Sequence, residues 1–111
     1  MSAIPIVTTA HVAGHRIVRS LGLVRGNTIR VRHVGSDIMA SLRNFIGGEI
    51  PEYTKMMAGA REQTLDRMHA HATMLDADAV VEVRFTTSMV MAGAAEILVY
   101  GTAVKLERDD S

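Results

Sequence analysis

The stretch AVVEVRFTTSMVMAGAAEILVYGTAVKL, residues 79–106, decides the fold. From Ala79 to Thr86, apolar and polar residues alternate with a period of two, which is typical of a half-buried strand. The residues expected on its apolar side are Ala79, Val81, Val83 and Phe85. Gly93 supplies a hairpin turn, and Ile97–Leu106 returns as the partner strand. The sequence therefore predicts an antiparallel hairpin at the end of the chain.

The second strand of this hairpin is apolar on both faces. One side carries Leu98, Tyr100, Val104 and Leu106, and the other carries Ile97, Val99 and Ala103. One layer of helices covers only one side of a sheet, so the other side needs a second cover. In a small chain a neighbouring subunit is the simplest cover, which favours a homo-oligomer. A fold with helices on both faces is the alternative.

Two helices are expected before the hairpin. Ser36-Asp37 offers an N-cap and an acid for the first turn of a helix that runs to Ile46 and ends at Gly47-Gly48. Pro51 suits the first position of a second helix, which should run to about Leu75. The apolar stripe expected on this second helix consists of Met57, Ala60, Leu65, Met68, Ala72 and Leu75.

The N-terminal part is expected to be extended. Ile4–Thr9 is predicted as an edge strand and Ile17–Val24 as a second strand, with a turn near Gly14 between them. Gly26-Asn27 is interpreted as a turn, after which residues 28–34 continue as a strand or an extended loop. The elements together predict one α+β domain over residues 1–111, with a core at about 4–107 and a charged tail at 108–111.

Composition excludes several classes of protein. The chain has 111 residues and no cysteine, so disulfides, thiolate ligands and thiol nucleophiles are absent. No signal peptide or transmembrane run is evident, and we expect a cytoplasmic protein. The net charge is zero, with +4 in residues 1–50 (6 − 2) and −4 in residues 51–111 (6 − 10). Because the basic residues are not interleaved with stacking aromatics, we expect the halves to neutralise each other and no nucleic acid to bind.

Five His and eight Met make a soft-metal site worth testing against their spacing. His69 and His71 are two apart on a predicted helix, so their side chains diverge and cannot chelate one ion together. His11 and His15 flank a turn, but no third ligand is near them in sequence. We expect no metal site within one chain.

Tyr53, Arg61 and Glu62 form the best candidate site, as residues of a ligand site or, more simply, of a contact between subunits. The Gly47-Gly48 loop lacks the lysine and the spacing of a phosphate-binding motif. No nucleophile, base and orienting residue can be grouped, so we expect a protein that is not an enzyme.

An ordered set of segments resembles a known family. The segments are Gly47-Gly48 with Tyr53, Ala60-Arg61-Glu62, residues 75–81, residues 84–88, and residues 93–97 running into Tyr100-Gly101-Thr102-Ala103-Val104. In this order they resemble the YbjQ-like family, small proteins named for heavy-metal binding, over about residues 4–107. Asp76 is a departure, because family members usually have Gly there, at the end of a helix.

The resemblance implies a dodecin-like subunit, with two helices packed on one face of an antiparallel sheet, assembled as a ring for which a pentamer is favoured. It implies no established activity. We therefore expect an oligomeric protein that binds a metal ion or small ligand at subunit interfaces. The alternatives are a non-catalytic structural or protein-interaction module, and an enzyme of unknown reaction.

Overall fold

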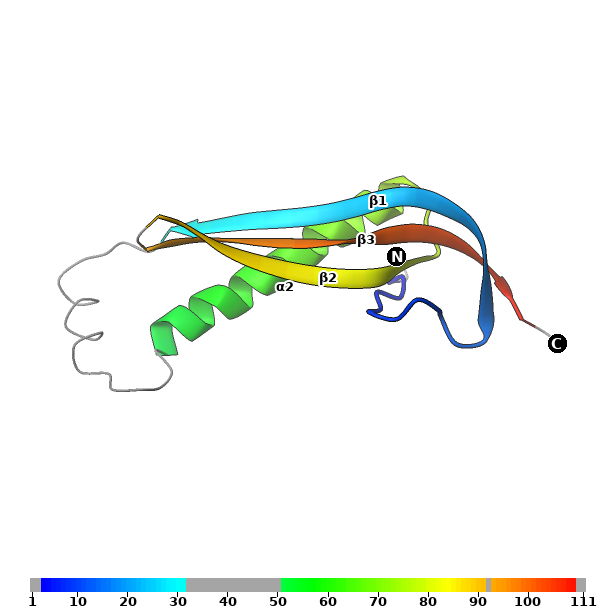
Figure 1. Cartoon of the computed structure of the whole chain (residues 1–111), viewed down its shortest axis with the longest axis horizontal. Helices are drawn as coiled ribbons and strands as arrows, with labels where there is room; N and C mark the ends of the chain where they lie inside the picture. The colour runs from blue at the N-terminus through cyan, green and yellow to red at the C-terminus, as the bar shows by residue number, and fades with distance from the viewer. Residues whose placement is uncertain (1–2, 32–50, 92, 110–111) are drawn as a thin grey trace.

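The computed structural model describes residues 3–31, 51–91 and 93–109, without the side chains of 51–54. Its elements are strand β1 (His15–Val31), helix α2 (Pro51–Met74), strand β2 (Ala79–Met91) and strand β3 (Ala94–Arg108). The strands form one antiparallel sheet in the order β1-β3-β2, with α2 on one face (Figure 1). The predicted α+β class and the C-terminal hairpin are confirmed. The helix predicted for residues 36–46 lies outside the described residues.

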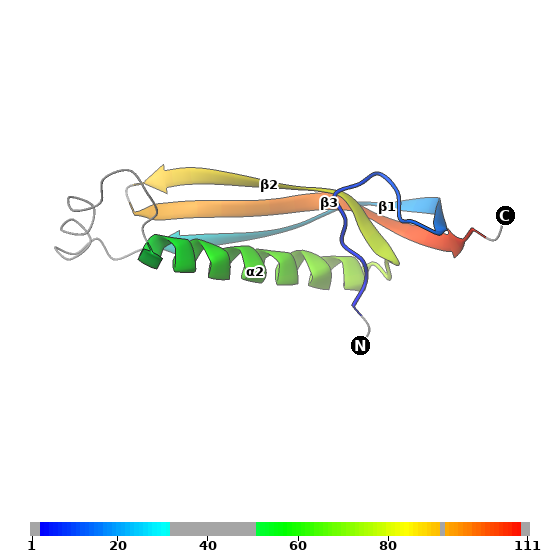
Figure 2. The same ribbon diagram turned by 90° about the horizontal axis from the view of Figure 1, so that it is seen from below.

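The sheet is a long, narrow ribbon. β1 has 17 residues and β3 has 15, which at about 3.3 Å per residue gives strands of roughly 50 Å. Three strands spaced about 4.8 Å apart make a sheet far narrower than it is long. The helix α2, of 24 residues, runs along this ribbon (Figure 2).

The predicted turn at Gly26-Asn27 is wrong, because β1 is one continuous strand through both residues. Gly26 is required instead by close packing of α2 on the sheet. A Cβ at Gly26 would meet the carbonyl oxygen of Thr64 and lie 2.7 Å from the amide nitrogen of Met68. The helix backbone thus rests directly on the strand at this glycine.

The single apolar face predicted for β2 is also wrong, because a bulge divides the strand. The register passes from Val81↔Thr102 to Arg84↔Tyr100, so Glu82 and Val83 together face Gly101. Glu82 has a φ of 57° and takes the first position of this bulge. Val83 therefore packs with the core beneath α2, whereas Ala79 and Val81 belong to the cluster on the opposite face.

The helix α2 begins at Pro51, as predicted, and ends at Met74. Its centre faces the sheet through fully buried residues at every fourth position. They are Ala60, Thr64, Met68 and Ala72. The stripe is thus confirmed at its centre, with Thr64 as an additional member. In the described part of the chain, no helix is both long enough and apolar enough to span a membrane.

Asp76 adopts the left-handed conformation usual for glycine at a helix end, with a φ of 60°. The N–H of Ala77 donates to the carbonyl of Ala72, and the N–H of Asp76 donates to that of Thr73. These two bonds satisfy the carbonyls of Ala72 and Thr73 in the last turn of α2. The turn therefore forms with Asp at this position.

The N-terminal arm, residues 4–14, covers part of the second face of the sheet. Val7 and Val12 pack against the buried Val81 and Val104, together with Leu106. The expectation that a single chain leaves the second face of β3 uncovered is thus correct only in part. Leu98 and Tyr100, nearer the hairpin, remain half-buried.

Candidate functional site

A groove runs between α2 and the part of β2 that follows the bulge. It arises because α2 packs over β1 and, to a lesser extent, β3, so that β2 lies beside the helix (Figure 2). Its volume is about 330 Å³. The lining residues are Ile6, Thr8, Leu65, Asp66, His69, Val83 and Phe85.

The groove is mainly apolar with a polar rim. Val83 and Phe85 come from β2, Leu65 from α2 and Ile6 from the N-terminal arm, while Asp66 and His69 supply charge and hydrogen-bonding capacity. Phe85 remains 43% exposed. Such a surface can hold an apolar side chain or a small apolar ligand, with a polar group of the ligand near Asp66.

His69 and His71 lie on different sides of α2, as their spacing predicts. The N–H of Ile4 donates to His69 Nε2 at 3.4 Å, so this ring ties the N-terminal arm to the groove. The N–H of Arg25 donates to His71 Nδ1 at 3.3 Å, which places that ring against β1. Each ring bonds a main-chain amide of another segment, which spacing alone does not indicate.

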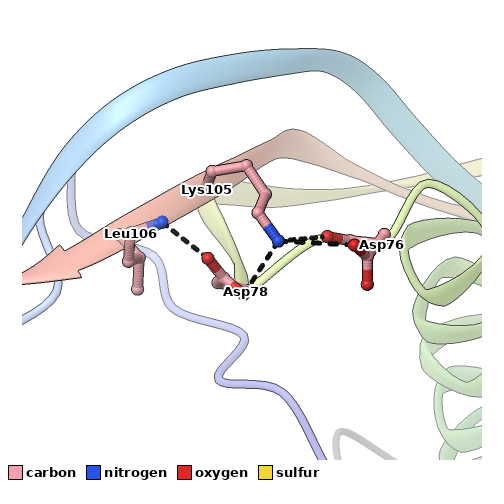
Figure 3. Close-up of polar contacts among 4 residues, drawn as sticks. All are labelled: Asp76, Asp78, Lys105 and Leu106. Carbon is pink, nitrogen blue, oxygen red and sulfur yellow. Dashed lines mark hydrogen bonds and ion pairs between the residues drawn. The ribbon is translucent and has the colours of Figure 1, made fainter.

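A second hollow, of about 400 Å³, lies at the C-terminal end of α2. It is bordered by residues 3–5 at the start of the described chain and by Thr73, Asp76, Ala77 and Asp78. Asp78 and Lys105 beside it are joined by a hydrogen bond of 3.2 Å (Figure 3). Lys105 Nζ also donates to the main-chain carbonyl of Asp76 at 2.9 Å.

These bonds shift the pKa of both side chains in the direction that favours their charged forms. The N–H of Leu106, which donates to Asp78 at 2.8 Å, holds the pKa of the Asp78 carboxyl below its ordinary value, and Lys105 adds to this effect. The hydrogen bond to Asp78 raises the pKa of the Lys105 ammonium above its ordinary value. The ionised Asp78 and Lys105 side chains consequently link the segment after α2 to β3.

The Asp78–Lys105 cluster connects two segments of the fold and does not have the arrangement of a metal centre. Asp78 uses one carboxylate oxygen to accept from a main-chain amide and the other to accept from Lys105, while the side chain of Asp76 is 99% exposed. Within residues 3–31, 51–91 and 93–109, no three His, Cys, Asp or Glu side chains are grouped so that they could hold a metal ion.

The candidates chosen from sequence lie on α2, outside the residues that line either hollow. Arg61 and Glu62 are exposed, and the side chain of neither one forms a hydrogen bond or ion pair with another described residue. Tyr53 lies in the first turn of α2, and its side chain is not described. Arg61 and Glu62 thus lie outside both hollows, and the use of the three residues as a ligand site or subunit contact stays a prediction. The structure brings together Leu65, His69 and Phe85, which sequence reasoning missed.

The fold and these sites define a class of protein: a small, two-layer α+β protein in whose described part the helix α2 lies along a three-stranded antiparallel sheet. The chain belongs to the YbjQ-like family, whose description is "Putative heavy-metal-binding" and whose model matches residues 4–107.

Similar proteins are found in archaea and bacteria. A UPF0145 protein from Methanosarcina acetivorans is 57% identical over 101 residues, covering 91% of this chain and 95% of that protein. A UPF0145 protein from Dehalococcoides mccartyi is 55% identical over 102 residues, with 92% and 98% covered. One from Pyrococcus abyssi is 52% identical over 110 residues, with 99% and 96% covered. The names of these relatives state no reaction.

A solved structure shares the fold. It is a protein of unknown function of the DUF74 family from Pediococcus pentosaceus, with a TM-score of 0.59 and 15% sequence identity. The match covers 96% of this chain and 100% of that one.

Proposed function

We propose that this chain is the subunit of a non-catalytic homo-oligomer, a dodecin-like ring with five copies as the favoured number, that binds a small ligand or metal ion at subunit interfaces in the cytoplasm. The family description motivates the metal ion as ligand. The proposal of self-association has its own support in the surface of the sheet.

The observation that carries the proposal is the exposed second half of β2. Phe85, Met89, Val90 and Met91 are 43%, 69%, 50% and 64% exposed. The segment 85–91 contains no charged residue. Neighbouring exposed apolar side chains on a charge-free strand are unfavourable in water and favour a protein interface.

The narrow shape of the subunit supports the same proposal. A ribbon of three strands with one helix encloses a core of Val, Ala, Ile and Met side chains, in which no aromatic residue is fully buried among the described residues. Such a core gives limited stability to a lone chain. Burial of the exposed apolar residues between copies would add to it, because each square ångström of apolar surface removed from water contributes about 25 cal/mol.

Symmetry accounts for a ligand site that one chain does not contain. In a ring, each side chain recurs once per subunit around the axis. A single His or Glu per chain could thus supply several ligands to one ion, although the described part of one chain groups no three such residues.

Light scattering and native mass spectrometry on untagged protein test the assembly. We expect a mass that is a multiple of 12.0 kDa and stays constant at micromolar concentration. A stable monomer under these conditions would exclude the ring and every shared site.

Metal analysis of the same untagged protein, followed by titration with zinc, copper and nickel, tests the ligand. We expect binding with a fixed number of ions per ring. Assembled protein that takes up no metal would remove the metal ion from the proposal and leave the assembly intact.

A further inference from the structure

We infer that the outer edge of β2, residues 85–91, and the groove beside it receive the β1 edge of a second copy of this chain, head to tail. The inference rests on the proposed self-association and names the two surfaces that meet. A chain that joins its neighbour through two different edges can close a ring, whereas two identical edges make only a pair.

The first observation is that the N-terminal arm covers the outer edge of β2 only up to Arg84. The N–H of Val7 donates to the carbonyl of Val80 at 2.9 Å, and the N–H of Val83 donates to the carbonyl of Val7 at 3.1 Å. Arg84 Nη1 then donates to the carbonyls of Thr8 and Val83, both at 2.9 Å. The Arg84 guanidinium thereby marks the end of the covered part of the edge.

From residue 85 onward, no further strand borders the outer edge of β2 in the described part of the chain. β2 is the last strand in the sheet order, and its bridge to the N-terminal arm joins Ile6 to Val80, before the bulge. A charge-free strand edge of this length without a neighbouring strand is a template for another strand. Main-chain hydrogen bonds would then supply affinity along the segment.

The second observation is that α2 lies over β1 and not over β2. The helix side of β2 is therefore left for a helix of the neighbouring copy to cover. On the helix side of β2, Phe85 and Met89 project beside α2 rather than beneath it, because their partners Val99 and Ala95 belong to the covered face of β3. A neighbour that adds its β1 here also brings its own α2, which lies over its β1. That second helix would close the groove from the other side.

The third observation is that the exposed residues of β1 match this surface. Val18, Leu23, Ile29 and Val31 are 47%, 63%, 53% and 71% exposed. Leu23, Ile29 and Val31 lie opposite Thr102, Glu96 and Ala94, on the face away from α2. In an added strand they would lie beside the residues of β2 on that same face, where the segment 85–91 places no charge. A strongly charged peptide would find no complement along this segment, which favours a second copy as the occupant.

The charges on the two sides of α2 agree with this pairing. On the side toward β1, Arg67 Nη1 donates to the carbonyl of Asn27 at 2.6 Å, and His71 accepts from Arg25. On the side toward β2, Asp66 lies on the rim of the groove. In a head-to-tail contact, Arg67 of one copy would approach Asp66 of the next. Arg67 and His71 each engage a single main-chain group of β1, so most of the strand stays available to a neighbour.

Strand direction distinguishes this contact from a two-fold dimer. β1 and β2 are both antiparallel to β3, so they run parallel to each other. A head-to-tail contact in a ring would pair β2 with a parallel β1, whereas a two-fold dimer would pair β2 with an antiparallel copy of itself.

Cross-linking tests the contact directly, because the natural chain has no cysteine. Ser88 and Ile29 lie in one row of the sheet, each opposite Glu96, on the face away from α2. We would mix the single variants Ser88→Cys and Ile29→Cys, let them exchange subunits, and add a short bifunctional maleimide. Mass spectrometry of the digested product identifies which cysteines are joined.

We expect the dominant product to join the cysteine introduced at position 88 to the cysteine introduced at position 29. Products that join only position 88 to position 88 would show a two-fold contact and overturn the inference while preserving self-association. Assembled protein without a cross-link at either position would also overturn it. If the natural chain is monomeric by light scattering, the proposed function itself fails, so the two failures are distinguishable.

A matched pair of substitutions provides a second readout. Met89→Lys places a charge on the outer edge of β2, whereas Met74→Lys places the same charge at the end of α2, where Met74 is 85% exposed. We expect Met89→Lys to reduce the mass to that of one chain at micromolar concentration and Met74→Lys to leave the assembly unchanged. Circular dichroism confirms that both variants fold. An intact ring with Met89→Lys, or equal loss with both variants, would contradict the inference.

Discussion

Gly26→Ala should destabilise the protein by about 3 kcal/mol, at the upper end of the cost of overpacking. The added Cβ would meet the helix backbone itself, at the carbonyl oxygen of Thr64 and at 2.7 Å from the amide nitrogen of Met68. Ordinary contact begins at 3.4 Å, so α2 would have to move away from β1 by at least about 0.7 Å (3.4 − 2.7) at Met68. No side-chain rotation relieves this contact, because its atoms belong to the main chain.

Gly59→Ala is the matched control, since it adds the same methyl group to a glycine of α2 with nothing within 4 Å of the new atom. Alanine is preferred over glycine in a helix, so this variant should gain up to about 1 kcal/mol. Urea unfolding at one fixed protein concentration measures both changes. For Gly26→Ala we also expect a fall in melting temperature on the order of 10 °C. A Gly26→Ala variant as stable as the natural protein would refute the interpretation of Gly26 as a point of helix contact.

Three further predictions follow from the described contacts. Thr64→Val should lower the free energy of unfolding by about 1–3 kcal/mol. It removes the hydrogen-bond partner of the buried Thr28 hydroxyl, which lies 2.8 Å from Thr64 Oγ1. Replacing both Thr28 and Thr64 by Val should recover part of that loss, because no unpaired hydroxyl is then left. Double-mutant urea titrations measure this, and a neutral Thr64→Val would contradict it. Arg84→Met should speed hydrogen exchange at the Val7 amide, because Arg84 holds the N-terminal arm against β2. Exchange within β3 should stay unchanged. Unchanged exchange at Val7 would argue against this role of Arg84. Asp78→Asn should make the free energy of unfolding depend less on pH in the acid range. The pKa of Asp78 is lowered from 3.8 in the folded state. The ionised carboxylate therefore stabilises the fold above pH 3.8, and this stabilisation is lost as the pH falls through the folded pKa. Unfolding midpoints from pH 6 to pH 2 test the change, and an unaltered acid profile would exclude it.

The elements that depend on local pattern could be predicted from the sequence. Pro51 marked the start of α2, and Gly93 marked the hairpin, because each acts through its own backbone preference. Asp76 was correctly expected at a helix end, where it adopts a φ of 60°. These features require no knowledge of distant contacts.

The errors arose where a distant segment determined the role of a residue. Gly26 was interpreted as a turn, because glycine in isolation indicates a turn, whereas the helix contact that requires it comes from Thr64 and Met68. The bulge at Glu82 changed the faces of β2, and alternation of apolar residues continued on both sides of it. One available signal was Gly101, where a Cβ would lie 2.8 Å from Val80 and 3.0 Å from Val83.

The candidate site was less predictable than the fold. Arg61 and Glu62 were chosen for their chemistry, yet the structure places no bonding partner beside either one in its described part. The groove exists because α2 packs beside β2 and not over it. This placement is set by tertiary packing, and no local sequence pattern indicates it. His69 was tested as a metal ligand and rejected because of its spacing from His71, and its hydrogen bond from the N–H of Ile4, 65 positions earlier, was not expected.

If the proposed self-association is correct, the ribbon shape of the chain makes its folding depend on protein concentration. The side chains left bare on β1 and β2 are as apolar as those beneath α2, so the same driving force serves folding and association. If copies join along these edges, dilution removes part of the force that keeps each chain folded, and the unfolding midpoint rises with the amount of protein. Thermal melts across a hundredfold range of concentration would then report on association as directly as on the fold.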